Sequence, residues 1–228
     1  PRESRYPFAL TTGRLRDHWH GMTRTGTIGR LFGHVSEPSV QLNPQDMERR
    51  GLKDGELVHV TSKRGSIVLP LQGSRTVNTT QAFIAMHWGP EYLSGRSSQG
   101  EPLAGVNALT TSAYCPTSKQ PELKHAAVKL LKAELPWQLM AAAWLPQDEA
   151  LAAQLRLRAL MPAFDYAHCV PFGREGREGS DDRDTAANAA IGRVGLLLRA
   201  AAQAPASDEL LAQIEHALGI GGAQVLRY

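Results

Sequence analysis

The sequence predicts a mixed fold, with a mainly β barrel over residues 1–133 and a smaller α+β domain over residues 134–228. Two observations predict it. Glycine, threonine and valine with polar turns dominate before residue 133, whereas alanine and leucine dominate after it. The first part consists of short apolar runs between turn signals, and the second alternates strand patterns with helix patterns. The domain boundary is therefore expected at residues 133–136.

Length and composition indicate a water-soluble globular protein. The chain has 228 residues, 42% hydrophobic and 21% charged, as is usual for globular domains. It contains no apolar run that could span a bilayer and no secretory signal. The net charge of +3 comes from basic residues scattered among acidic ones, which argues against a nucleic-acid partner. Cys115 and Cys169 lie far apart, so a reducing cytoplasm is expected. Because the sequence starts at Pro1 without a methionine, we expect a piece of a longer polypeptide.

The first part is expected to hold short strands and one short helix. Asn43 predicts the N-cap of the helix, Pro44 its first position and Gly51 its end. Period-two alternation of apolar residues predicts strands on both sides of the turn at 62–65. The expected strands cover residues 6–10, 56–61, 66–71 and 82–86, and residues 91–105 are expected to be a long polar stretch. Many short strands with long loops favour a β-barrel.

The second part is expected to follow the order β-α-β-β-α-β, the ferredoxin-like split unit. In its first helix Leu151, Leu155 and Ala159 recur at helical spacing, and Ser207 predicts the N-cap of its second helix. The expected strands cover residues 137–145, 164–172, 193–201 and 224–228, the helices 147–160 and 207–218, and a polar loop 173–188. The alanine-rich run 186–204 is equally compatible with a helix.

A dense polar run, TTGRLRDHWHGMTR at residues 11–24, follows the first strand and is too polar for a core. Thr12-Gly13-Arg14 predicts a phosphate-binding turn, because glycine lets backbone N–H groups approach an anion and arginine adds charged donors. His18 or Trp19 can lie flat against an aromatic ring. A zinc site on His18 and His20 lacks a third ligand at tetrahedral spacing, and a hydrolase lacks its Gly-x-Ser-x-Gly turn.

The candidate residues of the polar run and of the later segments also have plain structural explanations. Trp19 can be a core side chain. Asp17 can be an ordinary partner of arginine, or it can accept hydrogen bonds from guanine. His87, after the strand at 82–86, can face a cleft or be a satisfied core histidine. Asn107 and Lys124 are single polar residues that indicate little alone.

Taken together, the motifs resemble a known family. The polar run is followed by Asn43-Pro-x-Asp46, Gly51-Leu-x-Asp54-Gly55, Phe83-Ile-Ala-Met-His-Trp88, Asn107-Ala-Leu-Thr110 and Cys115-Pro-Thr-Ser-Lys-Gln-Pro-Glu-Leu-Lys124. In this order they resemble the C-terminal molybdopterin-dinucleotide-binding domain of the bis-molybdopterin guanine dinucleotide oxidoreductases, over about residues 5–132. The His87-Trp88 pair, the appended alanine- and leucine-rich region and the run 164–173 are most similar to bacterial assimilatory nitrate reductases.

The resemblance implies a double-psi β-barrel for residues 5–132 and a bound molybdopterin guanine dinucleotide (Mo-bis-MGD). The polar run would cradle the dinucleotide and the pterin. Cys115 stands where the family often has an acid. The implied cofactor-binding residues are Thr12, Gly13, Arg14, Asp17, His18, Trp19, His20, Gly21, Thr23, Met86, His87, Asn107 and Lys124. The resemblance implies neither a catalytic residue nor a metal ligand in this chain.

The implied activity of the whole enzyme is the reduction of nitrate to nitrite, with a formate dehydrogenase of the same superfamily as the alternative. A [4Fe-4S] cluster and, in some members, a [2Fe-2S] cluster would lie outside this chain. The implied partners are the remaining domains of the polypeptide and an electron donor protein or reductase subunit, with no nucleic acid and no membrane. A third interpretation is a stand-alone barrel that binds a nucleotide, a peptide or a partner protein without catalysis.

Overall fold

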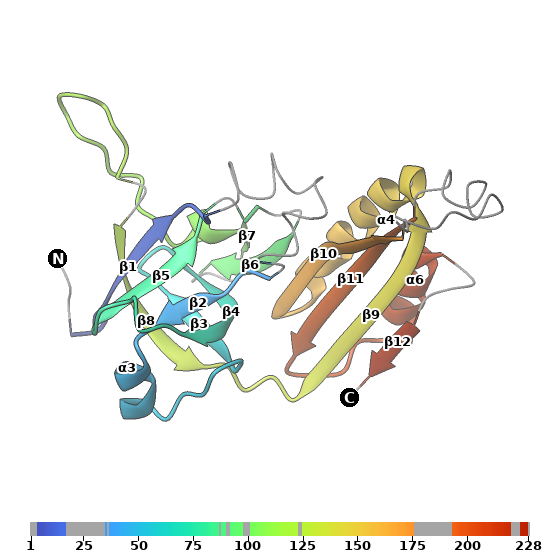
Figure 1. The fold of residues 1–228 in the computed structure, drawn as a ribbon, viewed down its shortest axis with the longest axis horizontal. Coiled ribbons are helices and arrows are strands. Elements are labelled where there is room, and N and C mark those ends of the chain that lie inside the picture. Colours follow the sequence, from blue (N-terminus) through green and yellow to red (C-terminus); the bar gives the residue numbers. More distant parts are fainter. Residues whose placement is uncertain are drawn as a thin grey trace, which may run out of the picture.

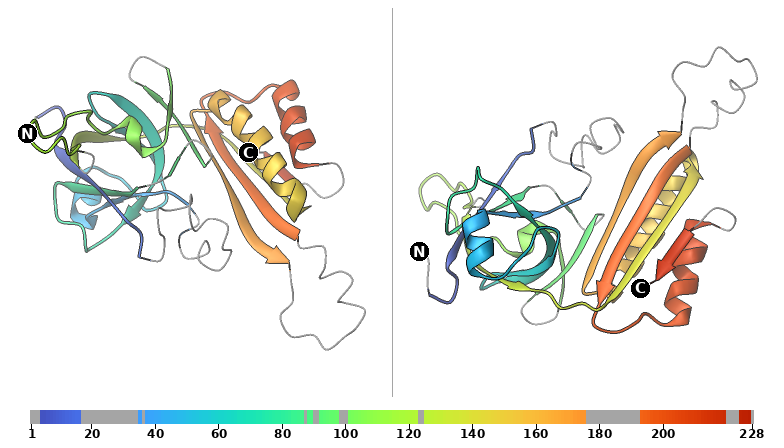
Figure 2. Two further views of the ribbon diagram at one scale, coloured as in Figure 1. Left: turned by 90° about the horizontal axis from the view of Figure 1, so that it is seen from above. Right: turned by 60° about the horizontal axis from the view of Figure 1, so that its bottom comes forward.

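The computed structural model describes residues 4–16, 35, 37–86, 88–89, 92–97, 101–122, 125–175, 193–219 and 224–227. The chain forms a barrel followed by a unit of one sheet and two helices (Figure 1). The sheet of the second unit lies between the barrel and the two helices (Figure 2). None of the helices in these ranges is long and apolar enough to cross a membrane.

Six strands close the barrel. Around the ring, β4–β2 and β5–β1 are parallel pairs, whereas β2–β5, β1–β8, β8–β3 and β3–β4 are antiparallel. This closed barrel with two parallel pairs confirms the predicted fold class. The strands are β1 (Phe8–Gly13), β2 (Val40–Leu42), β3 (Leu57–Thr61), β4 (Gly65–Gly73), β5 (Gln81–Ala85) and β8 (His125–Lys132).

Period-two patterns build the core of the barrel. Val58 and Val60 of β3 are fully buried, and Ile67, Leu69 and Leu71 of β4 are at most 2% exposed. Successive side chains of a strand point to opposite faces, so these residues lie on the inner face. Removing them from water is the main driving force for closing the barrel.

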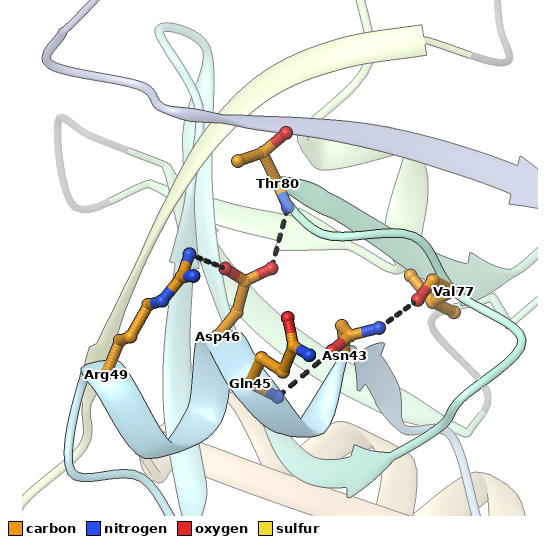
Figure 3. Close-up of polar contacts among 6 residues, drawn as sticks. All are labelled: Asn43, Gln45, Asp46, Arg49, Val77 and Thr80. Carbon is orange, nitrogen blue, oxygen red and sulfur yellow. Dashed lines mark hydrogen bonds and ion pairs between the residues drawn. The ribbon is translucent and has the colours of Figure 1, made fainter.

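One short helix, α3 (Pro44–Arg49), ties the barrel together through its polar side chains (Figure 3). Asn43 is the N-cap, as predicted: its Oδ1 accepts a hydrogen bond from the Gln45 backbone N–H at 3.0 Å, and its Nδ2 donates to the Val77 carbonyl at 2.8 Å. The buried Asp46 carboxylate accepts a hydrogen bond from the Thr80 N–H at 2.6 Å. The helix thereby holds the turn that leads into β5.

Two strands replace much of the polar stretch expected at residues 91–105. Strand β6 (Leu93–Ser97) pairs with β7 (Pro102–Ala104), with β4 of the barrel and with β10 (Tyr166–Glu175) of the second unit. No strand was expected in this polar stretch, because it has no apolar alternation. Pairing with distant strands decides its conformation. Through β6 the barrel and the second unit share one hydrogen-bonded sheet of 12 strands.

The second unit has the predicted β-α-β-β-α-β order. Its strand order is β12-β9-β11-β10 and its neighbouring strands are antiparallel, which is the ferredoxin-like arrangement. The helical alternative for the alanine-rich run was wrong at residues 193–202, which form a strand. Residues 173–175, predicted as loop, belong to β10, and 176–188 lie outside the described part. The elements are β9 (Trp137–Pro146), α4 (Gln147–Leu160), β10 (Tyr166–Glu175), β11 (Arg193–Ala202), α6 (Asp208–Leu218) and β12 (Gln224–Arg227).

Helix α4 does not bury the apolar stripe that its spacing suggested. Leu151 and Leu155 are 64% and 52% exposed, whereas Ala150, Ala153 and Leu157 are buried. Small alanine side chains let the helix approach its neighbours closely, and they pack in the same core as the sheet and α6. The face of α4 that packs against the sheet therefore differs from the stripe that contains Leu151 and Leu155.

Two hydrophobic cores form, one inside the barrel and one between the second sheet and its helices. Tyr166, Val170 and Ala201 of the second unit pack with the barrel core. Ala133 and Leu135, in the chain that connects the two units, also belong to the barrel core. The domain boundary at residue 133 stays a prediction.

Replacing Asp46 by alanine is expected to lower the free energy of unfolding by about 1.5–3 kcal/mol, because a charge-assisted hydrogen bond to the Thr80 N–H is lost. Glu48→Ala is the matched control, since Glu48 is exposed on the same helix. Urea denaturation measures both. Equal losses in the two variants would show that the link to Thr80 does not stabilise the barrel.

Candidate functional site

The candidate site lies where the parallel strands β1 and β5 end side by side. Gly13 stands opposite Ala85, and the Met86 N–H donates a hydrogen bond to the Gly13 carbonyl at 2.8 Å. Thr12 is half-buried in β1 and Arg14, just beyond the strand, is exposed. The structure thus brings two of the predicted cofactor-binding segments together, Thr12–Arg14 and Met86.

A third predicted segment reaches the same neighbourhood through Gly105. This residue has φ +68°, and a Cβ at its position would lie 2.0 Å from the Trp88 carbonyl oxygen. Only glycine can approach the backbone after Met86 so closely. Gly105 begins a short 3-10 helix, Val106–Ala108, on which Asn107 is exposed. Asn107 is therefore placed by a glycine that packs against the Trp88 backbone, just beyond the end of β5.

A cleft of about 390 Å³ opens next to these strand ends. Leu15, Ala85 and Trp88 line it where β1 and β5 end, and one wall carries Gln41 and Gln72. The Gln41 amide donates a hydrogen bond to Gln72 Oε1 at 3.1 Å. The cleft combines apolar surface with a few fixed polar groups, which is typical of a ligand site.

Two acidic side chains also line the cleft, and both are held by hydrogen bonds. Asp54 accepts from the Gly73 N–H at 2.6 Å. Glu37 accepts from the Tyr166 hydroxyl at 2.8 Å and from Arg199 Nη1 at 2.6 Å. Burial, and next the nearby Glu37 carboxylate, raise the pKa of Tyr166, so this hydroxyl stays a donor.

The cations that could meet an anionic ligand lie at the edge of the cleft, since its described lining includes two carboxylates and no lysine or arginine. Both carboxylates of the cleft have donors of their own, and Arg199 balances the charge of Glu37. Arg14 and Arg16 are exposed just after β1, at the end from which Leu15 lines the cleft. Arginine is well suited to binding phosphate because its planar fork donates two parallel hydrogen bonds.

Eight predicted residues lie outside the described part of the chain, and they remain predictions. They are Asp17, His18, Trp19, His20, Gly21, Thr23, His87 and Lys124. Within the described ranges no group of three or more histidine, cysteine, aspartate or glutamate residues could hold a metal ion.

The family of the chain follows from a match over more than half of its length. Residues 8–127 match the family described as "Molydopterin dinucleotide binding domain". The chain belongs to this family. Both parallel strand pairs and the Gly105–Asn107 segment lie within the matched residues, and of the six barrel strands only β8 extends beyond them.

Several enzymes contain a region that is similar in sequence to this chain. The chain is similar to a "Nitrate reductase" from Klebsiella oxytoca, with 37% identity over 141 residues that make up 62% of this chain and 14% of the relative. A "Nitrate reductase" from Synechocystis sp. is 40% identical over 130 residues, 57% of this chain and 17% of the relative. An "F420-dependent formate dehydrogenase 2 subunit alpha" from Methanococcus maripaludis is 32% identical over 130 residues, again 57% and 17%. The chain thus matches only 14% to 17% of the length of these relatives.

Sequence reasoning missed Gly105 and the cluster of Glu37, Tyr166 and Arg199. A glycine two residues before Asn107 was a usable signal for a close backbone approach. The cluster left no signal, since its members are 129 and 162 residues apart. In the His87-Trp88 pair, Trp88 is only 3% exposed, and its ring packs edge-on against Tyr92 and His168, with centroids 5.9 and 6.2 Å apart.

The two cysteines have opposite environments. Cys115 is exposed, and hydrogen bonding, first with the Ser118 side chain and then with backbone N–H groups, lowers the pKa of its thiol. Cys169 is fully buried in β10, and burial raises the pKa of its thiol to about 12. A thiolate is the reactive form of cysteine, so only Cys115 combines access with thiolate character.

Gly105→Ala should destabilise the protein more than Gly51→Ala. Both glycines have positive φ, 64° at Gly51 and 68° at Gly105, but a Cβ at Gly51 has no atom within 4 Å. The control shows the cost of a positive φ alone, about 1–2 kcal/mol. Gly105→Ala adds the collision with Trp88 and a ψ of −166°, which at positive φ is essentially restricted to glycine. Urea denaturation compares the two, and equal losses would contradict the close contact.

Iodoacetamide should label Cys115 but not Cys169 in the folded protein, and both once urea unfolds it. Peptide mass spectrometry distinguishes the two sites. Ser118→Ala should slow the labelling of Cys115 at mildly alkaline pH, because losing the hydrogen bond raises the thiol pKa and lowers the thiolate fraction. Ser112→Ala is the control, since Ser112 lies in the same loop and bonds to Arg64 instead. Labelling of Cys169 before unfolding would contradict its burial.

Proposed function

We propose that this chain is the cofactor-binding part of a molybdenum-dependent nitrate reductase that holds molybdopterin guanine dinucleotide. The observation that carries the proposal is that Thr12–Arg14 and Met86 meet at the ends of β1 and β5, within a molybdopterin dinucleotide binding domain. Gly105, two residues before Asn107, packs against the Trp88 backbone just beyond the end of β5. The nitrate reductases among its relatives support the choice of substrate.

In this proposal the described residues bind and orient the cofactor. The guanidinium groups of Arg14 and Arg16 bind the phosphates, aided by the Thr12 hydroxyl and by backbone N–H groups after Gly13. The Asn107 amide contacts the pterin from the turn that Gly105 places against Trp88. The bound cofactor supplies the two-electron redox chemistry, while the protein contributes position and electrostatics.

The resemblance adds residues from the undescribed segments to this proposal. His18, Trp19 and His20 would lie near the pterin. Lys124 would complete the pterin and phosphate contacts. Independently of the resemblance, the carboxylate of Asp17 is suited to accept hydrogen bonds from the guanine edge. No general acid or base is assigned to this chain.

The rest of the enzyme is part of the same proposal. The relatives are much longer than the matched region, so we place the iron–sulfur clusters, the metal ligand and the nitrate pocket in other parts of the polypeptide. We further propose a cytoplasmic enzyme for nitrate assimilation, served by an electron donor protein or a reductase subunit.

A second candidate function is formate oxidation, because a formate dehydrogenase subunit is 32% identical over 130 residues. The two enzymes would share the cofactor contacts of this chain. Turnover assays of the full-length protein with nitrate and with formate distinguish them. The third interpretation, a binding module without catalysis, predicts a native protein that contains neither molybdenum nor guanine nucleotide.

Arg14→Ala and Lys124→Ala in the full-length protein should each lower its content of molybdenum and guanine nucleotide. A charge-assisted contact to phosphate contributes about 1.5–3 kcal/mol, which corresponds to roughly tenfold or more in affinity. Elemental analysis and nucleotide release measure the loss. Arg75→Ala is the control, because Arg75 is exposed in the turn before β5, at the far end from Met86. Full retention in both variants would overturn the assigned contacts.

A further inference from the structure

Two side chains of the second unit hold a carboxylate that lines the candidate site. Glu37 belongs to the barrel part of the chain and lines the cleft beside the β1 and β5 ends. Its Oε1 accepts hydrogen bonds from the Tyr166 hydroxyl at 2.8 Å and from Arg199 Nη1 at 2.6 Å, and its Oε2 lies 2.8 Å from the same nitrogen. Every one of these donors comes from the second unit.

The two donors are built into neighbouring strands. Tyr166 starts β10 and is 1% exposed, and Arg199 lies on β11, which pairs with β10. Tyr166 also packs in the barrel core, so both its own strand and the barrel hold its side chain in place. The Glu37 side chain is 27% exposed. The Glu37 carboxylate is therefore partly exposed to solvent, while Arg199 of the second unit balances its charge.

An unbalanced carboxylate in this position would oppose the proposed ligand. A dinucleotide brings a diphosphate, and like charges in a partly desolvated cleft repel strongly. Arg199 cancels the charge of Glu37, and Tyr166 fixes the direction of the carboxylate. The other acid of the cleft, Asp54, is held by a barrel donor, the Gly73 N–H. Only Glu37 depends on the second unit in this way among the described cleft residues.

We propose that Tyr166 and Arg199 are positioning residues of the cofactor cleft, which hold and neutralise Glu37 so that the barrel can accept an anionic dinucleotide. This rests on the proposed function. It gives the second unit a role at the cofactor, although Tyr166 and Arg199 both lie beyond the family match, which ends at residue 127. The unit also contacts the cleft through the edge-on rings of His168 and Trp88.

Charge compensation by Arg199 and simple packing of the second unit predict different effects on cofactor binding. If Arg199 only docks the second unit, Glu37→Gln and Arg199→Gln should weaken cofactor binding alike, and combining them should not help. If Arg199 neutralises Glu37, Arg199→Gln alone should weaken binding. Glu37→Gln should then leave binding at least as strong, and the double variant should recover it.

The test uses the full-length protein as the parent, the variants Glu37→Gln, Arg199→Gln and Arg199→Lys, and the double variant Glu37→Gln/Arg199→Gln. Molybdenum and guanine nucleotide per polypeptide are measured after dialysis at low and at high salt. We expect Arg199→Gln to lower cofactor affinity about tenfold at low salt, and less at high salt because salt screens the repulsion. Arg199→Lys keeps the charge and should stay near the parent. Arg158→Gln, on the helix face of the sheet, is the matched control.

The outcomes are distinct. If the parent holds cofactor but the double variant does not regain it, the inference is overturned and the proposed function stands. A loss of cofactor in Arg199→Gln that does not depend on salt has the same meaning. A parent without guanine nucleotide overturns the proposed function, and the inference with it. If Arg199→Gln fails to fold, Glu37→Gln still decides, because a loss of cofactor in that variant contradicts a role for charge compensation.

Discussion

Parallel pairing of β1 with β5 sets where a ligand site can form in this barrel. The strands run together from Ala9 opposite Gln81 to Gly13 opposite Ala85, so both end at the same edge. Backbone N–H groups and side chains that follow the two strands are thereby gathered at one place. A slip of one residue would turn the side chains of β5 to the other face of the sheet.

Helix α3 secures the entry to that pairing. The Asp46 carboxylate holds the N–H of Thr80, and the Thr80 carbonyl accepts a hydrogen bond from Ala9. The helix side chains thus act on the first residue pair of the parallel ladder, at the end opposite the candidate site. This explains how the Asn43-Pro-x-Asp46 motif contributes to the site without touching it.

Charge balance is the second constraint on the cleft. Both of its acids have donors, but Glu37 receives them from strands that follow it by more than a hundred residues in sequence. The second unit is joined to the barrel by the β6–β10 pairing and by a shared apolar core. The cleft of the binding domain is thereby in contact with a unit that lies beyond the family match.

Much of the fold was predictable because its signals are local. The N-cap at Asn43, the strand alternation around Ile67 and the β-α-β-β-α-β order were all confirmed. The segment at 91–105 and the buried face of α4 were not predicted. A polar strand such as β6 depends on the partners that flank it, and the exposed Leu151 shows that a helical stripe does not identify the face that packs.

The sequence by itself determined the capped helix, four of the six barrel strands and the motifs that mark the family, since each depends on residues within a few positions of one another. The barrel strands β2 and β8 were not expected. Only the tertiary structure decided that Met86 lies beside Gly13, that Gly105 packs on Trp88 and that Arg199 balances Glu37. The physical reason is that strand register, close backbone contacts and ion pairs join residues far apart in the chain. A local pattern specifies a helix or a strand, but it does not specify which distant residues that element contacts.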